Sequence, residues 1–310
     1  MKKRWRRRWE SVGEVFTFIL GPPFELLIRV IPLSWIYPLS RTLAQLGRIG
    51  LGRREKIARA NLRLVFGERK DQEEIQAIYQ GCLAKTITGF LELMKFCSLS
   101  PELVKERIEI IGRKTLDEML EKGTGIVAPT IHLGNFPLIA AKMALEGYPV
   151  EAIIKNPKNR YLAGWYTRAT EKLRIGFIDG GEKRLAARRS LQHLREGGIL
   201  MIVLDQNPPY DEIMVDFFGY PVPTFKGPMV LAMRTGAPIL PMFVVADRDW
   251  RHKIIVEKPF PLEMTGDKER DIIHNLSRLM KLSEGYIERF PEQWWWWHRR
   301  WKRHIGYKRL

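Results

Sequence analysis

The amino-acid sequence predicts an α/β fold: a central mixed, mostly parallel sheet flanked by helices, with an N-terminal membrane-associating helical segment. Beyond residue 113, short apolar runs alternate with stretches of helical periodicity, a pattern typical of crossover connections between parallel strands. Before residue 50, the chain is apolar and aromatic and begins with a basic stretch. We therefore divide the chain into an N-terminal segment over residues 1–50 and an α/β domain over residues 51–310.

The composition is that of a folded protein. The 310 residues are 45% hydrophobic and 28% charged, which argues against wholesale disorder. The two cysteines, Cys82 and Cys97, have no histidine at metal-ligand spacing. They are expected to be reduced packing thiols, and neither a disulfide framework nor a metal site is predicted.

The positive charge is concentrated at the two ends of the chain. Residues 1–10 carry six basic residues and one acid, and residues 299–310 carry six basic residues, so the ends supply +11 of the net charge of +17. Basic tails are compatible with nucleic acid, with an anionic membrane surface, or with simple solvation. Tryptophan accompanies the basic residues at both ends, which is typical of membrane interfaces.

The segment from residue 12 to residue 40 favours the membrane. Charged residues leave uncharged runs of ten (15–24) and eleven (30–40), whereas a spanning helix needs roughly 20. The pair Pro22-Pro23 is expected to break a helix. We predict two short helices lying against the membrane, and a single kinked span through residues 12–33 remains the alternative.

The remaining elements follow in order from periodicity and from glycine and proline signals. Helices are expected over residues 53–66, 71–97, 115–122, 136–147, 160–173, 183–196, 226–235 and 267–289. Strands are expected over residues 126–128, 150–154, 175–178, 199–204, 238–245 and 253–256, with a long loop before residue 226. A basic, Trp-rich helix is expected at the C-terminus, where the run Trp294–Trp297 would lie half in lipid. That apolar run and residues 15–40 argue against a nucleic-acid-binding protein.

The first candidate for chemistry is His132, in a loop that follows the apolar run Ile126–Ala128. Gly134 permits close backbone approach there, and Asn135 is the expected N-cap of the next helix. A helix N-terminus offers amide donors to an oxyanion, and a neutral imidazole beside it is a good general base. The competing interpretation is a histidine that serves only the packing of the fold.

Two further sites have polar or basic character. Asp205-Gln206-Asn207 follows the apolar run Ile199–Leu204, at the end of a strand where open α/β sheets bind ligands. These residues could orient a histidine or bind a hydroxyl, or they could form a plain loop. The helix 183–196 contains Arg184, a candidate for binding phosphate or carboxylate, although a solvated helix face would look the same.

Several common catalytic motifs are absent from the sequence. There is no Gly-x-Ser-x-Gly elbow, Walker loop, His-Glu-x-x-His helix or dinucleotide fingerprint. These absences argue against a serine hydrolase, an NTPase, a zinc protease and a Rossmann oxidoreductase.

The loop around His132 is similar to a known motif. The string Ala128–Phe136 (APTIHLGNF) resembles the His-x4-Asp/Glu region of the lipid A biosynthesis (lauroyl/myristoyl) acyltransferase family. Val215–Gly219 followed by Thr235–Pro238 resembles the middle of that family, and Pro291–Trp294 with His298–Arg300 resembles its terminal motif. The resemblance runs in order from about residue 12 to residue 303.

The resemblance implies transfer of a fatty acyl group from an acyl carrier protein or acyl-CoA to a hydroxyl of a lipid or glycolipid, such as a lipid A precursor. It implies His132 as general base. Gly134 and Asn135 are expected to shape the oxyanion region, and Arg184 and Gln206 are the candidates to contact substrate. No metal or redox cofactor is implied, because the thioester is a co-substrate. The implied location is the cytoplasmic face of a bacterial inner membrane, attached monotopically or by one N-terminal span.

One position departs from the family pattern. The family carboxylate, which follows the histidine after four intervening residues, is replaced by Pro137, which cannot hold an imidazole. Asp205 is the candidate to orient His132 instead, as the acid does in a Ser-His-Asp triad. The alternatives are a catalytically degenerate lipid-binding homologue and an acyltransferase that acts on another glycolipid.

Overall fold

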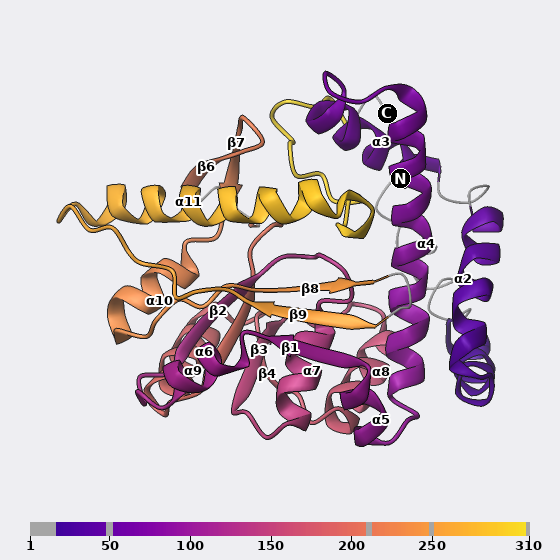
Figure 1. The fold of residues 1–310 in the computed structure, drawn as a ribbon, viewed down its shortest axis with the longest axis horizontal. Helices are drawn as coiled ribbons and strands as arrows, with labels where there is room; N and C mark the ends of the chain where they lie inside the picture. Colours follow the sequence, from indigo (N-terminus) through magenta and orange to yellow (C-terminus); the bar gives the residue numbers. More distant parts are fainter. Residues whose placement is uncertain (1–16, 48–51, 209–212, 248–250, 308–310) are drawn as a thin grey trace, which may run out of the picture.

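The computed structural model describes residues 17–47, 52–208, 213–247 and 251–307 (Figure 1). The basic stretch over residues 1–10 lies outside these ranges. The first part of the described chain is a helical layer that stands beside the sheet in Figure 1. It consists of a helix over residues 17–30 followed by α2 (Leu33–Gly47), α3 (Gly52–Phe66), α4 (Gln72–Phe96) and α5 (Pro101–Glu106).

The central sheet is built from two blocks that join at β2. One block is wholly parallel, in the order β2-β5-β3-β4, and the other has the order β1-β9-β8, with β8 and β9 antiparallel. Val127 joins the blocks, since its N–H donates to the Pro238 carbonyl and its carbonyl accepts from Leu240. The strands are β1 (Ile108–Ile111), β2 (Ile126–Thr130), β3 (Val150–Ile154), β4 (Gly176–Asp179), β5 (Ile199–Val203), β8 (Met242–Ala246) and β9 (His252–Val256).

Helices cover both faces of this sheet. Along β2 the side chains alternate, so Ile126 and Ala128 enter one core and Val127 enters the other. The first core includes residues of α5, of α6 (Arg113–Leu120), of α7 (Pro137–Leu145) and of α8 (Arg160–Lys172). The second includes residues of α3, of α4, of α9 (Lys183–Arg195), of α10 (Gly227–Thr235) and of α11 (Lys268–Arg289). The predicted mixed, mostly parallel α/β sheet is therefore confirmed.

Three strands were not predicted from the sequence. β1 is only four residues long, and the stretch expected to be a long loop holds the hairpin of β6 (Ile213–Phe217) and β7 (Tyr220–Thr224). Pro221 and Pro223 in β7 weaken any strand signal, because proline cannot donate to a ladder. The hairpin turns at Phe218 and Gly219, which both have positive φ, as a tight two-residue turn requires.

The predicted C-terminal helix is wrong. A short 3-10 turn, η1 (Pro291–Gln293), is followed by an extended stretch in which Trp294 pairs with Leu133. This stretch is not helical because its backbone is hydrogen-bonded to the loop around His132. The N–H of Trp295 donates to the His132 carbonyl, and the Gln293 carbonyl accepts from the Gly134 N–H. Trp294, Trp296, Trp297 and Trp301 are buried in the protein core and do not face lipid.

The N-terminal prediction needs one correction. The helix over residues 17–30 continues through Pro22 and Pro23. The carbonyls that lose their hydrogen-bond donors belong to Phe18 and Ile19, which are exposed, so solvent can satisfy them. No helix within the described residues is long and apolar enough to cross a bilayer.

Candidate active site

His132 and Asp205 meet at the carboxyl edge of the sheet. His132 follows β2 and Asp205 follows the adjacent parallel strand β5, so the two loops leave the sheet side by side. The Asp205 carboxylate lies 2.7 Å from His132 Nδ1 through one oxygen, and its other oxygen accepts from the His132 backbone N–H at 3.0 Å. The histidine is therefore held by its ring and by its backbone to one carboxylate.

The carboxylate of Asp205 is itself fixed by the protein interior. Its side chain is only 1% exposed, and the indole N–H of Trp294 donates to Oδ2 at 2.6 Å. Burial works to raise the pKa of this carboxyl, but the neighbouring His132 and the hydrogen bonds from His132 and Trp294 outweigh it, and the pKa lies below its usual value. Asp205 is thus an ionised, immobile partner for the imidazole.

The side-chain amide of Gln206 lies over the ring of His132, with its nitrogen 3.5 Å from Nδ1. The side-chain amide nitrogen of Gln206 lies 3.1 Å from His132 Nε2. A carboxylate accepts hydrogen bonds and cannot donate, so the contact with Asp205 places the ring proton on Nδ1 and leaves the lone pair on Nε2. Nε2 is consequently the atom that can accept a proton.

The loop after His132 depends on Gly134. This residue has φ +56°, and a Cβ there would lie 2.5 Å from the Val244 carbonyl oxygen, so any larger residue would force the loop off the sheet. The Gly134 N–H donates to the Gln293 carbonyl at 2.8 Å. Gly134 thus lets the loop approach the backbone of β8, but its N–H is already used and is not a spare oxyanion donor.

Asn135 is not the N-cap of α7. The cap position is Phe136, and the Asn135 amide instead donates to the Gly89 carbonyl at 3.1 Å and to Glu92 Oε2 at 3.2 Å. Glu92 is 1% exposed and pairs with His252 Nε2 at 2.8 Å. Because these acceptors hold the amide nitrogen, and no described residue donates to the side-chain oxygen of Asn135, that oxygen can accept from a ligand.

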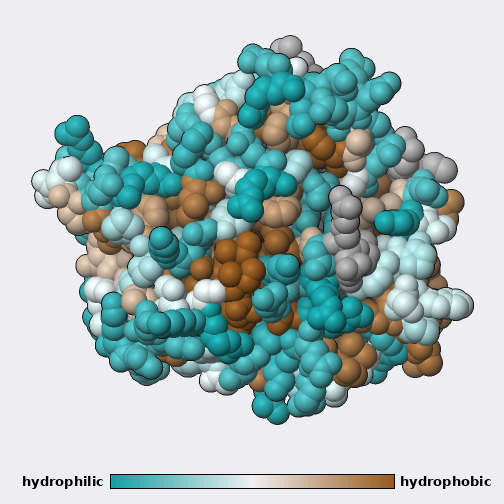
Figure 2. All heavy atoms as spheres, in the orientation of Figure 1, coloured by the Kyte–Doolittle hydropathy of each residue, from teal (hydrophilic) through white to brown (hydrophobic). Residues whose placement is uncertain are grey.

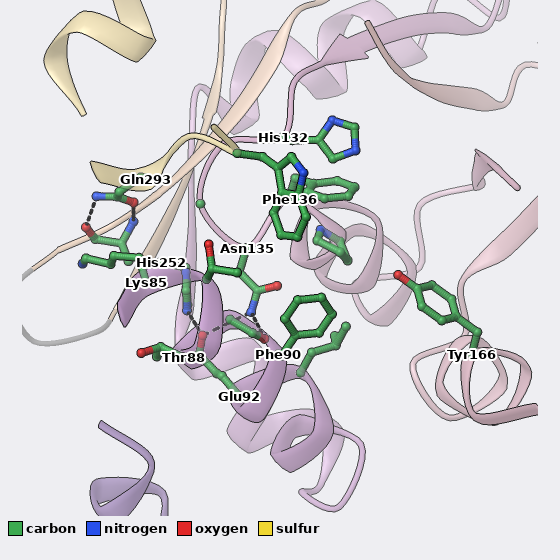
Figure 3. A pocket seen from close by; sticks show the side chains of 17 residues that line it. Lys85, Thr88, Phe90, Glu92, His132, Asn135, Phe136, Tyr166, His252 and Gln293 are labelled. Atoms are coloured by element: carbon green, nitrogen blue, oxygen red, sulfur yellow. Dashed lines mark hydrogen bonds and ion pairs between the residues drawn. The ribbon is translucent and has the colours of Figure 1, made fainter. Parts of the chain in front are cut away.

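These groups line a cavity between α4, α7 and α8 (Figure 3). Lys85 and Tyr166 lie on opposite sides of it, and Phe136 lies next to the His132 ring, in an edge-to-face arrangement with centroids 4.6 Å apart. The accessible surface of its wall is mostly apolar, although polar side chains contribute to it on several sides. The wall includes Lys85, Thr88, Phe90, Glu92, Leu93, His132, Asn135, Phe136, Pro137, Tyr166, His252 and Trp295.

The predicted site residues are only partly brought together. His132, Gly134 and Asn135 line the cavity, and Asp205 and Gln206 contact His132. Arg184 is exposed in the first turn of α9 and does not line the cavity, so its role in binding phosphate stays a prediction. Pro137 occupies the first position of α7 and lines the cavity where the family pattern has a carboxylate.

The sequence interpretation missed the partners that come from far along the chain. Glu92 and Trp294 are the clearest cases, together with His252 at the start of β9. A signal was present for two of them: Glu92 sits among the apolar positions of α4, and His252 alternates with the buried Ile254 and Val256. Charged or polar residues at core positions need a partner, which the sequence alone does not identify.

The C-terminal segment is hydrogen-bonded to Asn207, in the loop that carries Asp205. The Asn207 N–H donates to His298 Nε2 at 3.1 Å, and the Asn207 amide donates to the carbonyls of Arg299 and Arg300. Arg300 is fully buried and donates to the Asn207 side chain and to the Pro223 carbonyl. Burial is the main cause that lowers the pKa of His298 to about 4. The cations Arg300 and Lys302 lower this pKa further, whereas the Asp205 carboxylate works to raise it. The loop carrying Asp205 and Gln206 is therefore anchored at its next residue.

The arrangement fits proton abstraction by an oriented histidine. A buried carboxylate on Nδ1 and a lone pair on Nε2 are the features of a general base. Within the described residues, no group of three His, Cys, Asp or Glu side chains is arranged to hold a metal ion.

Comparison with known proteins gives the family. A model of the bacterial lipid A biosynthesis acyltransferases matches residues 6–303. The lipid A biosynthesis lauroyltransferase of Escherichia coli (strain K12) is 24% identical over 288 residues, which cover 91% of this chain and 90% of that protein. The match extends from before the N-terminal helices to the segment behind Asp205, so it includes both strand-end loops of the site. This chain belongs to the bacterial lipid A biosynthesis acyltransferase family.

Proposed function

We propose that this protein transfers a fatty acyl group from a thioester to a hydroxyl group of a lipid or glycolipid, most directly a lipid A precursor. The observation that carries the proposal is the His132–Asp205 pair at 2.7 Å, with Nε2 next to a largely apolar cavity. The family and the name of the E. coli relative support the lipid A acceptor. The donor is an acyl carrier protein or acyl-CoA, consumed as co-substrate, and an acidic carrier protein would suit the basic chain.

In the proposed reaction, His132 Nε2 takes the proton of the acceptor hydroxyl as its oxygen attacks the thioester carbonyl. Asp205 stabilises the imidazolium that forms. When the tetrahedral intermediate collapses, the C–S bond breaks and the imidazolium returns the proton to the leaving thiolate. The backbone N–H groups of Asn135 and Phe136, at the start of α7, are the donors we assign to the oxyanion.

We also propose attachment to the cytoplasmic face of the bacterial inner membrane through the N-terminal helices. Among the residues that the structure describes, nine of the sixteen exposed large apolar side chains lie between Phe18 and Leu46. Figure 2 shows apolar patches at the right-hand edge of the molecule, where Figure 1 has these helices. Exposed apolar side chains on helices too short to span a bilayer fit a monotopic attachment.

The deciding experiment is incubation of purified protein with labelled acyl carrier protein and a panel of lipid acceptors, with mass spectrometry of the products. Wild-type protein is expected to acylate a lipid A precursor. His132→Ala is expected to lower the rate about 10²–10⁴-fold, the usual contribution of a general base. A His132→Ala protein that keeps more than about a tenth of the rate would remove His132 from this role.

One observation favours a second candidate function. Pro137 replaces the family carboxylate, as expected in a lipid-binding homologue that has lost catalysis. Such a protein would bind anionic vesicles and the acceptor lipid but would form no acylated product with any donor in the panel.

A further inference from the structure

We propose that the side-chain oxygen of Asn135 accepts a hydrogen bond from the substrate, and that Glu92 and His252 are a positioning pair that aims this oxygen into the cavity. The group it accepts from is a hydroxyl or an amide N–H other than the reacting hydroxyl. This inference rests on the proposed acyl transfer and concerns how the same site recognises its substrate.

The orientation of the Asn135 amide is fixed by its two acceptors. Its nitrogen lies 3.1 Å from the Gly89 carbonyl oxygen, which cannot donate, and 3.2 Å from Glu92 Oε2. The two N–H groups are therefore used by α4, and the side-chain oxygen must face another way. Figure 3 shows this oxygen turned away from Glu92, toward the side of the cavity where Tyr166 lies. No described residue donates to it.

Glu92 can fix the amide because its own carboxylate is held by two other elements. Glu92 is 1% exposed, and His252 Nε2 in β9 lies 2.8 Å from the same oxygen that accepts from Asn135. The hydroxyl of Tyr37, in α2, lies 3.4 Å from the other oxygen. The carboxylate thus has contacts on both oxygens, and it cannot turn without breaking them.

The group that Asn135 binds has to be a second donor on the substrate. The reacting hydroxyl has a single proton, and the proposed reaction gives that proton to His132 Nε2. Asn135 is only 7% exposed, and a buried acceptor without a donor costs free energy, so a substrate that supplies the donor is preferred over one that lacks it. The donor belongs either to the acceptor lipid or to the arm that carries the thioester.

The first test measures steady-state kinetics of Asn135→Ala. Loss of one hydrogen bond made equally in the ground state and the transition state predicts a KM about fivefold higher with kcat unchanged. A rise for the acceptor lipid places the second donor on that lipid, and a rise for the acyl carrier protein places it on the thioester arm. An unchanged KM for both substrates would overturn the inference. The matched control is Gln192→Ala on the exposed face of α9, which is expected to behave as wild type.

The second test isolates the positioning pair. Glu92→Met has no acceptor oxygen and is expected to raise the same KM about fivefold, whereas Glu92→Gln, whose oxygen can still accept from Asn135, should stay within about twofold. Added to Asn135→Ala, Glu92→Met should raise KM no further, because its effect passes through Asn135. A further rise of similar size would overturn the positioning role. The control is Glu284→Met, a buried carboxylate of α11, which should lower stability and leave KM unchanged.

Two further measurements need neither turnover nor a Glu92 variant. In calorimetric titration with the lipid A precursor and, separately, with acylated carrier protein, one of the two should bind Asn135→Ala with a Kd about fivefold higher than wild type. Equal Kd values for both would overturn the inference. If this difference is found but wild type transfers no acyl group, the proposed function fails and the binding role of Asn135 stands.

The last measurement uses the wild-type protein with ¹⁵N-labelled asparagine. The side-chain NH₂ protons of Asn135 are donated to two acceptors, so they are expected to exchange with solvent at least about tenfold more slowly than those of the exposed Asn156. Equal exchange rates at the two residues would show that Glu92 and Gly89 do not hold the amide, and the positioning role would be lost.

Discussion

At the scale of single residues, the site is organised by one carboxylate with three donors around it. Asp205 accepts from the His132 ring, from the His132 backbone and from the Trp294 indole. The last two donors share Oδ2, so the two oxygens are not interchangeable. This asymmetry makes the pair sensitive to replacement by an amide.

Asp205→Asn is expected to reduce turnover about 10³–10⁴-fold, the loss seen when a triad carboxylate is replaced by an amide. The asparagine oxygen must face the N–H groups of Trp294 and His132, which directs its NH₂ group at Nδ1. That contact moves the ring proton to Nε2 and removes the lone pair that we propose accepts the substrate proton. Steady-state kinetics with the active acceptor measure the effect. A loss of less than tenfold would mean that His132 works without Asp205.

His298 gives the protein a pH-dependent stability. Its folded pKa of about 4 lies below the ordinary value of 6.5, so the unfolded chain binds a proton that the folded chain does not between these values. Stability therefore falls as pH drops from 6.5 toward 4, by up to about 2 kcal/mol at pH 5. His298→Gln, whose side-chain oxygen can still accept from Asn207, should remove this part of the slope in urea unfolding at pH 7 and pH 5. Equal slopes in the two proteins would exclude His298 as the cause.

The residues of the site could be predicted from the sequence to the extent that they follow strands. His132 and Asp205 both end apolar runs, and parallel strands bring such residues to one edge. Trp294 and Glu92 could not be predicted, since they reach the site from a C-terminal segment and a helix that pack over it. No local pattern encodes which distant element supplies a hydrogen bond.

At the scale of elements, α7 shows how a motif position can change while the site persists. Pro137 starts this helix, a position where proline's missing N–H has no cost. The carboxylate that the family pattern provides there comes here from the loop after β5.

Pro137→Glu is expected to leave turnover within about threefold of wild type, because Nδ1 is already bonded to Asp205 and a new carboxylate has no orienting role to fill. The loss of proline at a compatible position should cost about 0.4–1 kcal/mol of stability. Kinetics and urea unfolding of the same preparation measure both. A rise in turnover above tenfold would show that Asp205 alone orients the histidine poorly.

Elements with strong periodicity were predicted well, and those whose shape depends on tertiary contacts were not. The strand over residues 150–154 and the helix 267–289 agree with β3 and α11 within a residue. The β6–β7 hairpin was not predicted because Pro221 and Pro223 make the sequence of β7 look unlike a strand. The segment after Pro291 was assigned to a helix although its backbone pairs with the His132 loop. Local propensity cannot anticipate a partner that lies over 150 residues away in the chain.

At the scale of the whole molecule, the N-terminal helices are both part of the fold and the proposed membrane contact. Ile28 and Ile36 are fully buried, the Lys95 ammonium donates to the Arg29 carbonyl at 2.6 Å, and Gly21 lies against the Tyr161 ring. Deleting residues 1–40 would therefore uncover the core as well as remove the exposed face. Substitutions on that face test attachment more cleanly.

Leu27→Glu with Val30→Glu is expected to weaken binding to anionic vesicles more than tenfold, since each buried aliphatic side chain contributes about 1.5–3 kcal/mol. Thermal stability should stay the same, because both side chains are at least half exposed. Leu185→Glu on α9, also about half exposed, is the matched control and should bind as wild type. Vesicle flotation in low and high salt measures this. Full release of wild type by salt alone would contradict an apolar attachment.

The pairing of residues 291–301 with the His132 loop has a consequence for the order in which the protein is made. Trp294, Trp295 and His298 all contact the two strand-end loops of the site, and they follow the entire α/β body in the sequence. While a chain is being synthesised, the sheet can pair before these residues exist, but Asp205 then lacks its indole donor and Asn207 its imidazole acceptor. A nascent or proteolysed chain that stops before residue 291 would keep the two contacts between Asp205 and His132 but would lack the third donor to this carboxylate. The proposed acyl transfer is therefore expected to depend on residues 291–301, although these residues do not include His132 or Asp205.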